Sequence, residues 1–99
     1  MAAKYDLSLE ATEDLYSIWE YTVDTWSEDQ ADKYYDLLYA GMAKIAESPL
    51  TVGKPYNKIL LGLWGYHVQR HMIFYIIQPN DRILIVRVLH DSMDYAQHF

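Results

Sequence analysis

The last third of the chain constrains its fold most, because it contains two long apolar runs separated by a turn. The runs occupy residues 63–77 and 82–90, and Gln78-Pro79-Asn80-Asp81 stands between them. β-Branched and aromatic residues dominate both runs, which have the lengths of strands. We therefore expect residues 63–90 to form three strands of one antiparallel sheet.

The first half of the chain predicts a short strand followed by two helices. Residues 5–9 alternate between polar and apolar side chains, and Ser8 is placed to cap the helix that follows. Ser27-Glu28-Asp29-Gln30 is a capping box that starts a second helix, and Pro49 ends that helix after Ser48. Because little chain separates the two helices, we expect an antiparallel helical hairpin.

Each predicted helix carries one apolar face with residues at intervals of three and four. Glu13 and Asp14 are expected on a solvated face, and Gly41 is expected to permit the close approach of a neighbouring segment. The apolar faces consist of Ala11, Leu15, Ile18, Trp19, Thr22 and Trp26 in the first helix and of Ala31, Tyr34, Leu38, Met42 and Ile45 in the second.

Residues 50–61 are predicted to be the one irregular connection, and they carry Lys54 and Lys58. The predicted order is then β-α-α-β-β-β, an α+β fold in which the N-terminal strand and helical hairpin pack on an antiparallel sheet. At 99 residues the chain is expected to be one domain, residues 1–99.

Charge is distributed unevenly along the chain. Residues 1–49 contain 11 acidic and 3 basic side chains, a net of −8, whereas residues 50–99 contain 3 acidic and 5 basic ones, a net of +2. A negatively charged partner would therefore meet the sheet half. The net charge of −6 makes direct binding of nucleic acid through phosphate contacts unfavourable.

The absence of cysteine excludes disulfides, a thiolate nucleophile and a cysteine-based zinc site. No apolar segment resembles a secretory signal or approaches the length of a membrane span, so we expect a cytoplasmic protein. His67 and His71 are four residues apart, a spacing of roughly 13 Å on a strand, which is too long for two ligands of one zinc ion. No metal or other cofactor is expected.

Arg87 lies inside an apolar strand, where a guanidinium requires a partner. A period of two places it on one face with Ile83, Ile85 and Leu89, and places His90 with Leu84, Val86 and Val88 if the strand is still regular at that point. Two roles remain open for Arg87. It either anchors the C-terminal tail through Asp91 or Asp94, or it contacts a partner.

Several of these segments together resemble the ParE toxins of bacterial type II toxin–antitoxin modules, within the RelE/ParE superfamily. The resemblance runs nearly end to end, and its most specific part is the last segment. The segments are Tyr5-Asp6-Leu7-Ser8, Asp14-Leu15-Tyr16-Ser17-Ile18-Trp19-Glu20-Tyr21-Thr22 followed by Trp26 and Gln30-Ala31, Gly53, His71-Met72-Ile73-Phe74-Tyr75, and Arg87-Val88-Leu89-His90-Asp91-Ser92-Met93-Asp94.

This resemblance implies a non-enzymatic toxin that inhibits DNA gyrase, blocks replication and growth, and is silenced by a ParD-like antitoxin. The antitoxin would carry a ribbon-helix-helix DNA-binding domain, so that contact with DNA is indirect. Tyr16, Trp19 and Tyr39 are candidate antitoxin contacts, with packing against the sheet as the other interpretation. The candidate gyrase contacts are Arg70, Arg87, His90, Met93, His98 and Phe99.

Two alternatives remain. The superfamily includes ribosome-dependent mRNA interferases, for which Arg70, Arg87 and His90 would be the charge-stabilising and proton-transfer candidates. Interferases commonly carry an arginine where Met72 stands here, and a methionine cannot stabilise charge on a scissile phosphate. Tyr95 matches the tyrosine that they carry near the C-terminus. The third possibility is a toxin that has lost activity and only binds its antitoxin.

Overall fold

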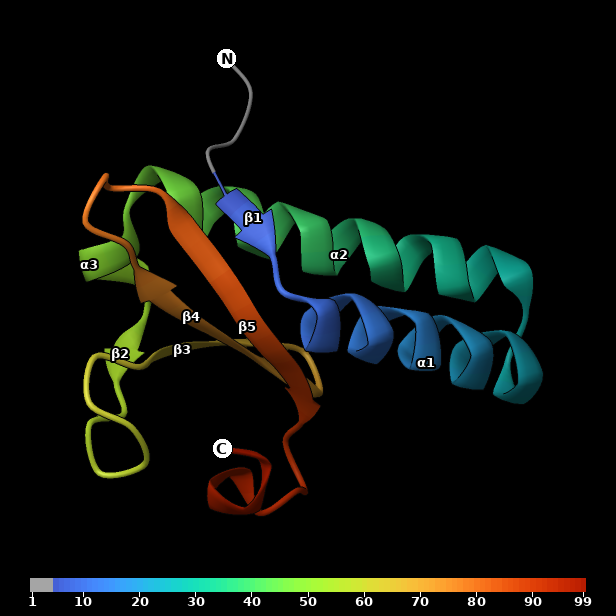
Figure 1. Cartoon of the computed structure of the whole chain (residues 1–99). Coiled ribbons are helices and arrows are strands. Elements are labelled where there is room, and N and C mark those ends of the chain that lie inside the picture. Colours follow the sequence, from blue (N-terminus) through green and yellow to red (C-terminus); the bar gives the residue numbers. More distant parts are fainter. Residues whose placement is uncertain (1–4) are drawn as a thin grey trace.

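A helical hairpin lies across one face of a five-stranded sheet in the computed structural model, which describes residues 5–99 (Figure 1). The hairpin consists of α1 (Leu9–Thr25) and α2 (Glu28–Glu47), and the α+β prediction is confirmed. The sheet order is β1-β5-β4-β3-β2. The remaining elements are β1 (Tyr5–Leu7), α3 (Pro49–Val52), β2 (Lys54–Pro55), β3 (Trp64–Val68), β4 (His71–Ile77), β5 (Ile83–His90) and the 3-10 helix η1 (Tyr95–His98).

Both long helices begin at the predicted serine caps. The Ser8 hydroxyl accepts a hydrogen bond of 3.0 Å from the amide of Ala11, and the Ser27 hydroxyl accepts one of 3.1 Å from the amide of Gln30. Each serine thus satisfies one of the amides that a helix start leaves without an intrahelical partner. α2 ends with Ser48 as its C-cap, as predicted, and Pro49 is the first residue of α3.

The sheet differs from the prediction at its two edges. β3, β4 and β5 are antiparallel as expected, but β1 runs parallel to β5, with Tyr5 opposite Ile83. The amide of Ser8 continues this pairing by donating to the carbonyl of Ile85 at 2.9 Å. At the other edge, the connection predicted to be irregular contains α3 and also β2, which pairs antiparallel with β3. Both additions cover strand edges that would otherwise expose unpaired amides and carbonyls.

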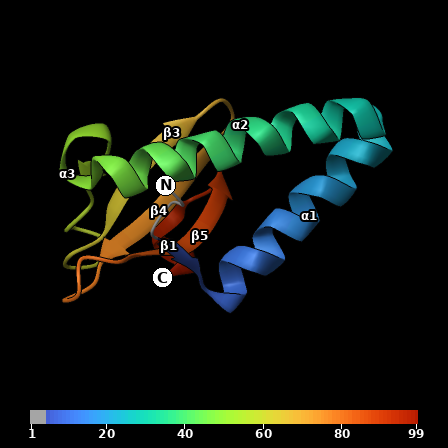
Figure 2. The ribbon, with the colours of Figure 1, turned by 90° about the horizontal axis from the view of Figure 1, so that it is seen from above.

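The main core lies between the hairpin and the sheet. α2 crosses the strands and α1 diverges from it (Figure 2). Gly41 allows α2 to lie close to β3, because a Cβ atom at this position would lie only 2.7 Å from Cγ2 of Val68. The fully buried members of this core are Ala11, Leu38, Met42, Ile45, Ile73, Tyr75 and Ile85.

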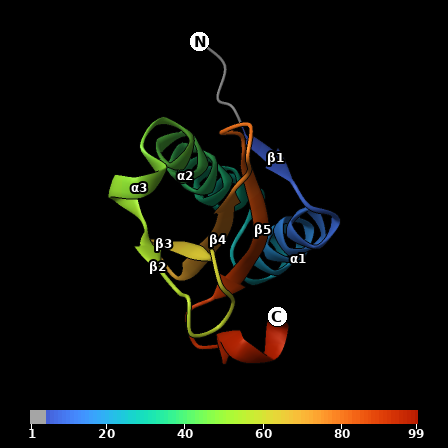
Figure 3. The ribbon, with the colours of Figure 1, turned by 60° about the vertical axis from the view of Figure 1, so that its left-hand side comes forward.

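A second, smaller core covers the opposite face of the sheet. Leu63, Met72, Phe74 and Leu89 are buried there. The loop of residues 56–63 and the C-terminal tail lie together below the sheet in the view of Figure 3. Within the tail, the rings of Tyr95 and Phe99 meet the ring of Phe74 edge to face, with centroids 4.9 and 5.1 Å apart.

A β-bulge in β5 overturns the predicted alternation of that strand. Phe74 pairs with Arg87, but the next residue, Tyr75, pairs with Ile85, so Val86 has no partner in β4. The extra residue shifts the alternation by one position. Arg87 is therefore opposite Phe74 in the second core. It shares a face with Leu89, as predicted, but not with Ile83 and Ile85. His90 likewise shares a face with Val88, as predicted, but not with Val86.

No helix within residues 5–99 is long and apolar enough to cross a bilayer.

Candidate functional site

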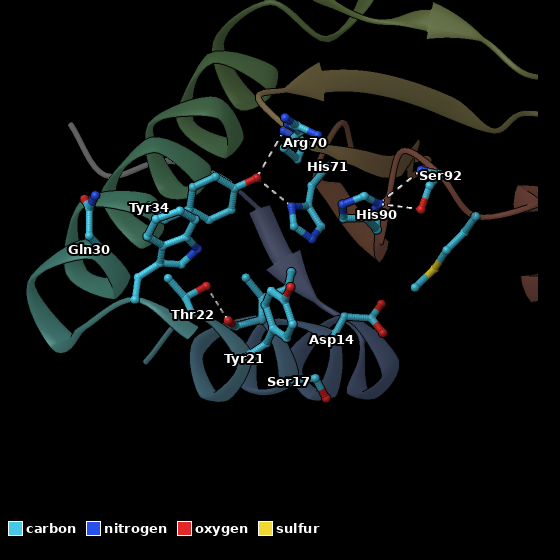
Figure 4. A pocket seen from close by; sticks show the side chains of 13 residues that line it. Asp14, Ser17, Tyr21, Thr22, Gln30, Tyr34, Arg70, His71, His90 and Ser92 are labelled. Atoms are coloured by element: carbon cyan, nitrogen blue, oxygen red, sulfur yellow. Dashed lines mark hydrogen bonds between the residues drawn. The ribbon is translucent and has the colours of Figure 1, made fainter. Parts of the chain in front are cut away.

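A groove of about 610 Å³ lies where α1, the start of α2, the β3–β4 turn and the end of β5 meet (Figure 4). Both α1 and the strand side of the groove supply polar and apolar side chains, and the two histidines and the arginine of the lining come from the strand side. The lining residues are Asp14, Ser17, Ile18, Tyr21, Thr22 and Trp26 with Gln30, Tyr34, Arg70, His71, His90, Ser92 and Met93.

The Tyr34 hydroxyl connects α2 to the β3–β4 turn. It accepts a hydrogen bond of 3.1 Å from the amide of Arg70 and lies 2.6 Å from Nδ1 of His71. The turn also contains Gln69 at a φ of 54°, in the left-handed region that residues other than glycine adopt infrequently. Tyr34 thus holds both residues that follow this unusual backbone position.

His71 is the most buried polar side chain of the groove. It is 9% exposed, and its ring meets that of Tyr34 at 5.4 Å and that of His90 at 5.3 Å, both edge to face. Burial and, to a smaller extent, the neighbouring His90 together lower the pKa of His71 from 6.5 to about 4. The imidazole is consequently neutral at pH 7.

His90 is held at the end of β5 by the turn that follows it. The amide of Ser92 donates to Nδ1 of His90 at 3.1 Å, and the Ser92 hydroxyl lies 2.7 Å from the same atom. Since Nδ1 accepts from the amide, the ring proton of neutral His90 is on Nε2.

Asp14 is not on a solvated face, contrary to the prediction. Its carboxylate accepts two hydrogen bonds of 2.8 Å from the guanidinium of Arg87 and one of 2.9 Å from the amide of Val88. Hydrogen bonding to Asp14 raises the pKa of Arg87 above its usual value. Arg87 does not bind Asp91 or Asp94, and it reaches the C-terminal tail only through the carbonyl of His98, at 3.4 Å. The arginine therefore joins β5 to α1.

The six candidate target contacts are divided between two locations. Arg70, His90 and Met93 line the groove. Arg87 binds Asp14, and the tail residues His98 and Phe99 lie on the far face of the sheet.

Tyr34 and Trp26 also line the groove, but the sequence did not indicate this, because their helical spacing assigns both to the face that packs on the sheet. The signal for Tyr34 was its hydroxyl group, which requires a partner in a buried position.

The three candidate antitoxin contacts do not line the groove. Tyr16 is 62% exposed on α1. Trp19 and Tyr39 both meet the ring of Tyr35 edge to face, at 5.3 and 5.6 Å, and so form an aromatic row along the contact between α1 and α2.

A second hollow, of about 450 Å³, lies on the far side of the sheet from the hairpin core. Lys54, Met72 and Tyr95 line it together with His67 and Asp91, whose side chains form a contact of 3.2 Å. His67 lies in β3 and His71 is the first residue of β4, so the spacing expected for both on one strand does not apply. Within residues 5–99, no three or more histidine, cysteine or acidic side chains are arranged to hold a metal ion.

Residues 5–95 match the family model described as the ParE toxin of the type II toxin–antitoxin system parDE. The chain belongs to this family. It is 34% identical to Toxin ParE1 of Mycobacterium tuberculosis and 36% identical to Toxin ParE1 of Caulobacter vibrioides, each over 94 residues covering 95% of both chains. It is 30% identical to Toxin ParE of Escherichia coli over 92 residues, 91% of this chain and 86% of that one.

Two solved structures confirm the fold of this ParE-family chain. One is the chromosomal ParDE toxin–antitoxin system from P. aeruginosa, with a TM-score of 0.75, 15% identity and coverage of 90% of this chain and 98% of that one. The other is the toxin–antitoxin complex RelBE2 from Mycobacterium tuberculosis, with a TM-score of 0.60, 20% identity and coverage of 91% and 99%. The chain is therefore a toxin of the ParE family with the RelE/ParE fold.

Proposed function

We propose that this ParE-family toxin inhibits DNA gyrase by binding it or its cleaved complex with DNA, and thereby blocks replication and growth in the bacterial cytoplasm. The contacts of Arg87 and Arg70 are the observation that supports a mechanism of binding without catalysis. Both Nε and Nη2 of Arg87 are bonded to Asp14, so its charge is neutralised inside the protein. Arg70, by contrast, forms no ion pair with any of residues 5–99 and is exposed at the groove.

The proposed partner that silences the toxin is a ParD-like antitoxin with a ribbon-helix-helix domain. The likeness to a structure of the chromosomal ParDE toxin–antitoxin system from P. aeruginosa supports this assignment. A flexible antitoxin segment that orders on the toxin would meet the aromatic row of Trp19 and Tyr39 and the exposed ring of Tyr16. DNA binding by the pair would then be a property of the antitoxin.

A gyrase supercoiling assay with the purified chain tests the proposal. We expect loss of supercoiling and accumulation of cleaved DNA, and we expect Arg70→Ala to weaken both effects. Arg82→Ala is the matched control, since Arg82 is exposed but paired with Asp6 at 2.8 Å near the opposite end of β5. Unchanged supercoiling at saturating toxin, without cleaved DNA, would contradict gyrase as the target.

The second candidate function, ribosome-dependent mRNA cleavage, has one specific observation in its favour. Lys54, His67 and Tyr95 surround the far-face hollow, a set that can bind phosphate and transfer protons. Met72 also lines this hollow, at the position where interferases of the superfamily commonly carry an arginine. Arg70, Arg87 and His90, the interferase candidates from the sequence, are not among its lining residues. Cleavage of ribosome-bound mRNA that is lost in His67→Ala and retained in Arg87→Lys would favour this function over gyrase inhibition.

A further inference from the structure

One nitrogen of the most buried polar side chain in the groove has no protein partner. His71 is 9% exposed and uses Nδ1 to bond Tyr34, while no hydrogen bond joins Nε2 to any of residues 5–99. Figure 4 shows the edge of this ring that faces away from Tyr34 turned toward the space between α1 and β5. Within residues 5–99 no buried side-chain nitrogen or oxygen lacks a hydrogen-bond partner, so Nε2 is open to the groove. A polar atom that a mostly buried ring presents to a groove can bond a ligand atom there.

The hydrogen bonds around Tyr34 determine that this nitrogen is a donor. The amide of Arg70 donates to the Tyr34 oxygen, which leaves the hydroxyl proton free to donate to Nδ1 of His71. If Nδ1 carried the proton instead, the Tyr34 oxygen would accept twice and its own proton would have no partner. Nε2 of His71 therefore carries hydrogen and can donate it to an acceptor in the groove.

The rest of the groove favours an acceptor attached to an apolar body. Ile18, Tyr21 and Trp26 supply apolar wall, and the Thr22 hydroxyl donates at 2.7 Å to the Ile18 carbonyl, so that polar group is already satisfied. The carboxylate of Asp14 is compensated by three donors. Arg70 adds a positive charge to the lining, and the one acidic side chain there is already bonded to donors. The lining therefore does not favour a positively charged ligand.

We propose that the groove is a binding site for a small amphipathic molecule, with an aromatic or aliphatic body and an oxygen atom that accepts a hydrogen bond from Nε2 of His71. The volume of about 610 Å³ is within the range of pockets that bind small molecules. Its lining includes Arg70, to which we assign a gyrase contact, but binding of a small molecule can be measured without gyrase. It requires only the folded chain.

The test uses three probes with the same phenyl and alkyl body, namely 4-phenylbutyramide, 4-phenylbutyrate and 4-phenylbutylamine. The imidazole nitrogens of His71 are followed by NMR in the full chain during titration with each probe. Before any probe is added, the spectrum should show the neutral form with hydrogen on Nε2. We expect the amide and the carboxylate to shift the Nε2 resonance, and the amine to bind about tenfold more weakly, since it offers no acceptor.

Two exposed aromatic residues of α1 and its C-cap provide the control. Trp26 lines the groove and is 70% exposed, so Trp26→Ala should weaken binding of the amide without unfolding the chain. Tyr16 is 62% exposed outside the groove, and Tyr16→Ala should leave binding unchanged. The proposal is wrong if no probe moves the Nε2 resonance up to its solubility limit, if the amine binds as tightly as the amide, or if both variants behave alike.

Discussion

At the scale of single residues, two side-chain pairs join segments that are far apart in the sequence. Asp14 binds Arg87 across 73 residues, and Tyr34 binds His71 across 37. The sequence shows that Arg87 needs a partner, but it does not show which acid supplies it. A helical wheel assigns Asp14 to the outside of α1, and only the docking of α1 against β5 brings the carboxylate to the arginine.

The first prediction concerns the Asp14–Arg87 pair. Asp14→Ala removes the acceptor for the guanidinium and for the Val88 amide, both partly buried. We expect a loss of about 2–4 kcal/mol in the free energy of unfolding, because the arginine is left without its partner. Urea denaturation measures this loss.

A double-mutant cycle separates the pair from packing effects. Asp14→Leu combined with Arg87→Met replaces both charges by apolar groups, and we expect it to recover at least half of the stability lost in Asp14→Leu alone. Additive losses in the double variant would show that the two side chains act independently.

The second prediction concerns the pH dependence set by His71. Its pKa is about 4 in the folded chain and near 6.5 when unfolded, so the unfolded chain binds more protons between these values. Stability contributed by the neutral, buried ring is therefore fully present above pH 6.5 and is lost as the pH falls toward 4. The loss is about 2–3 kcal/mol.

The measurement is urea denaturation at pH 7.5, 6.0 and 4.5. His71→Gln has no titrating group at this position, so it should be less stable than the parent at pH 7.5 but lose less stability on acidification. Equal slopes of stability against pH in the two proteins would exclude His71 as the origin of the pH dependence.

At the scale of elements, local signals were predictable and shifts of register were not. The caps Ser8 and Ser27 depend on residues within the next turn of helix, and both were found from the sequence. The bulge at Val86 depends on how β5 meets β4, and a strict period of two fails only across it, where it wrongly places Arg87 with Ile85 and His90 with Val86. The groove could not be predicted from the sequence either, because α1, the β3–β4 turn and the end of β5 meet only in the folded chain.

The third prediction concerns the contact between α2 and β3. Alanine normally favours a helix over glycine by about 1 kcal/mol, but a Cβ atom at Gly41 would meet the stiff side chain of Val68 at 2.7 Å. We expect Gly41→Ala to destabilise the chain by about 1–2 kcal/mol, since overpacking outweighs the gain in helix propensity. Thermal or urea denaturation measures the change.

Two further variants identify the cause. Val68→Ala should relieve the clash, so that Gly41→Ala becomes neutral or stabilising in that background. Ala40 is an exposed neighbour in α2, and Ala40→Gly should cost about 1 kcal/mol through propensity alone. Destabilisation by Gly41→Ala that persists unchanged beside Val68→Ala would contradict the steric explanation.

At the scale of the whole molecule, the candidate target contacts lie on two different sides of the sheet. The groove lies between the helical hairpin and the end of β5, whereas the tail packs under the opposite face of the sheet (Figures 3 and 4). The resemblance to ParE toxins assigned target contacts to both places without their positions in space. The structure divides the six residues, and the two groups should differ in what they contribute.

The fourth prediction separates stability from inhibition through one residue of each group. The ring of Phe99 packs against Phe74 and is 40% exposed, so Phe99→Ala should cost about 1–2 kcal/mol of unfolding free energy. Because the change removes packing and no charge at the groove, gyrase inhibition per folded molecule should be preserved.

Arg70→Ala should weaken gyrase inhibition but leave the free energy of unfolding within about 0.5 kcal/mol of the parent, since Arg70 forms no ion pair within residues 5–99. Denaturation curves and supercoiling assays on the same preparations decide the matter. If Phe99→Ala abolishes inhibition while the protein stays folded, the tail is part of the target surface and the groove is not sufficient.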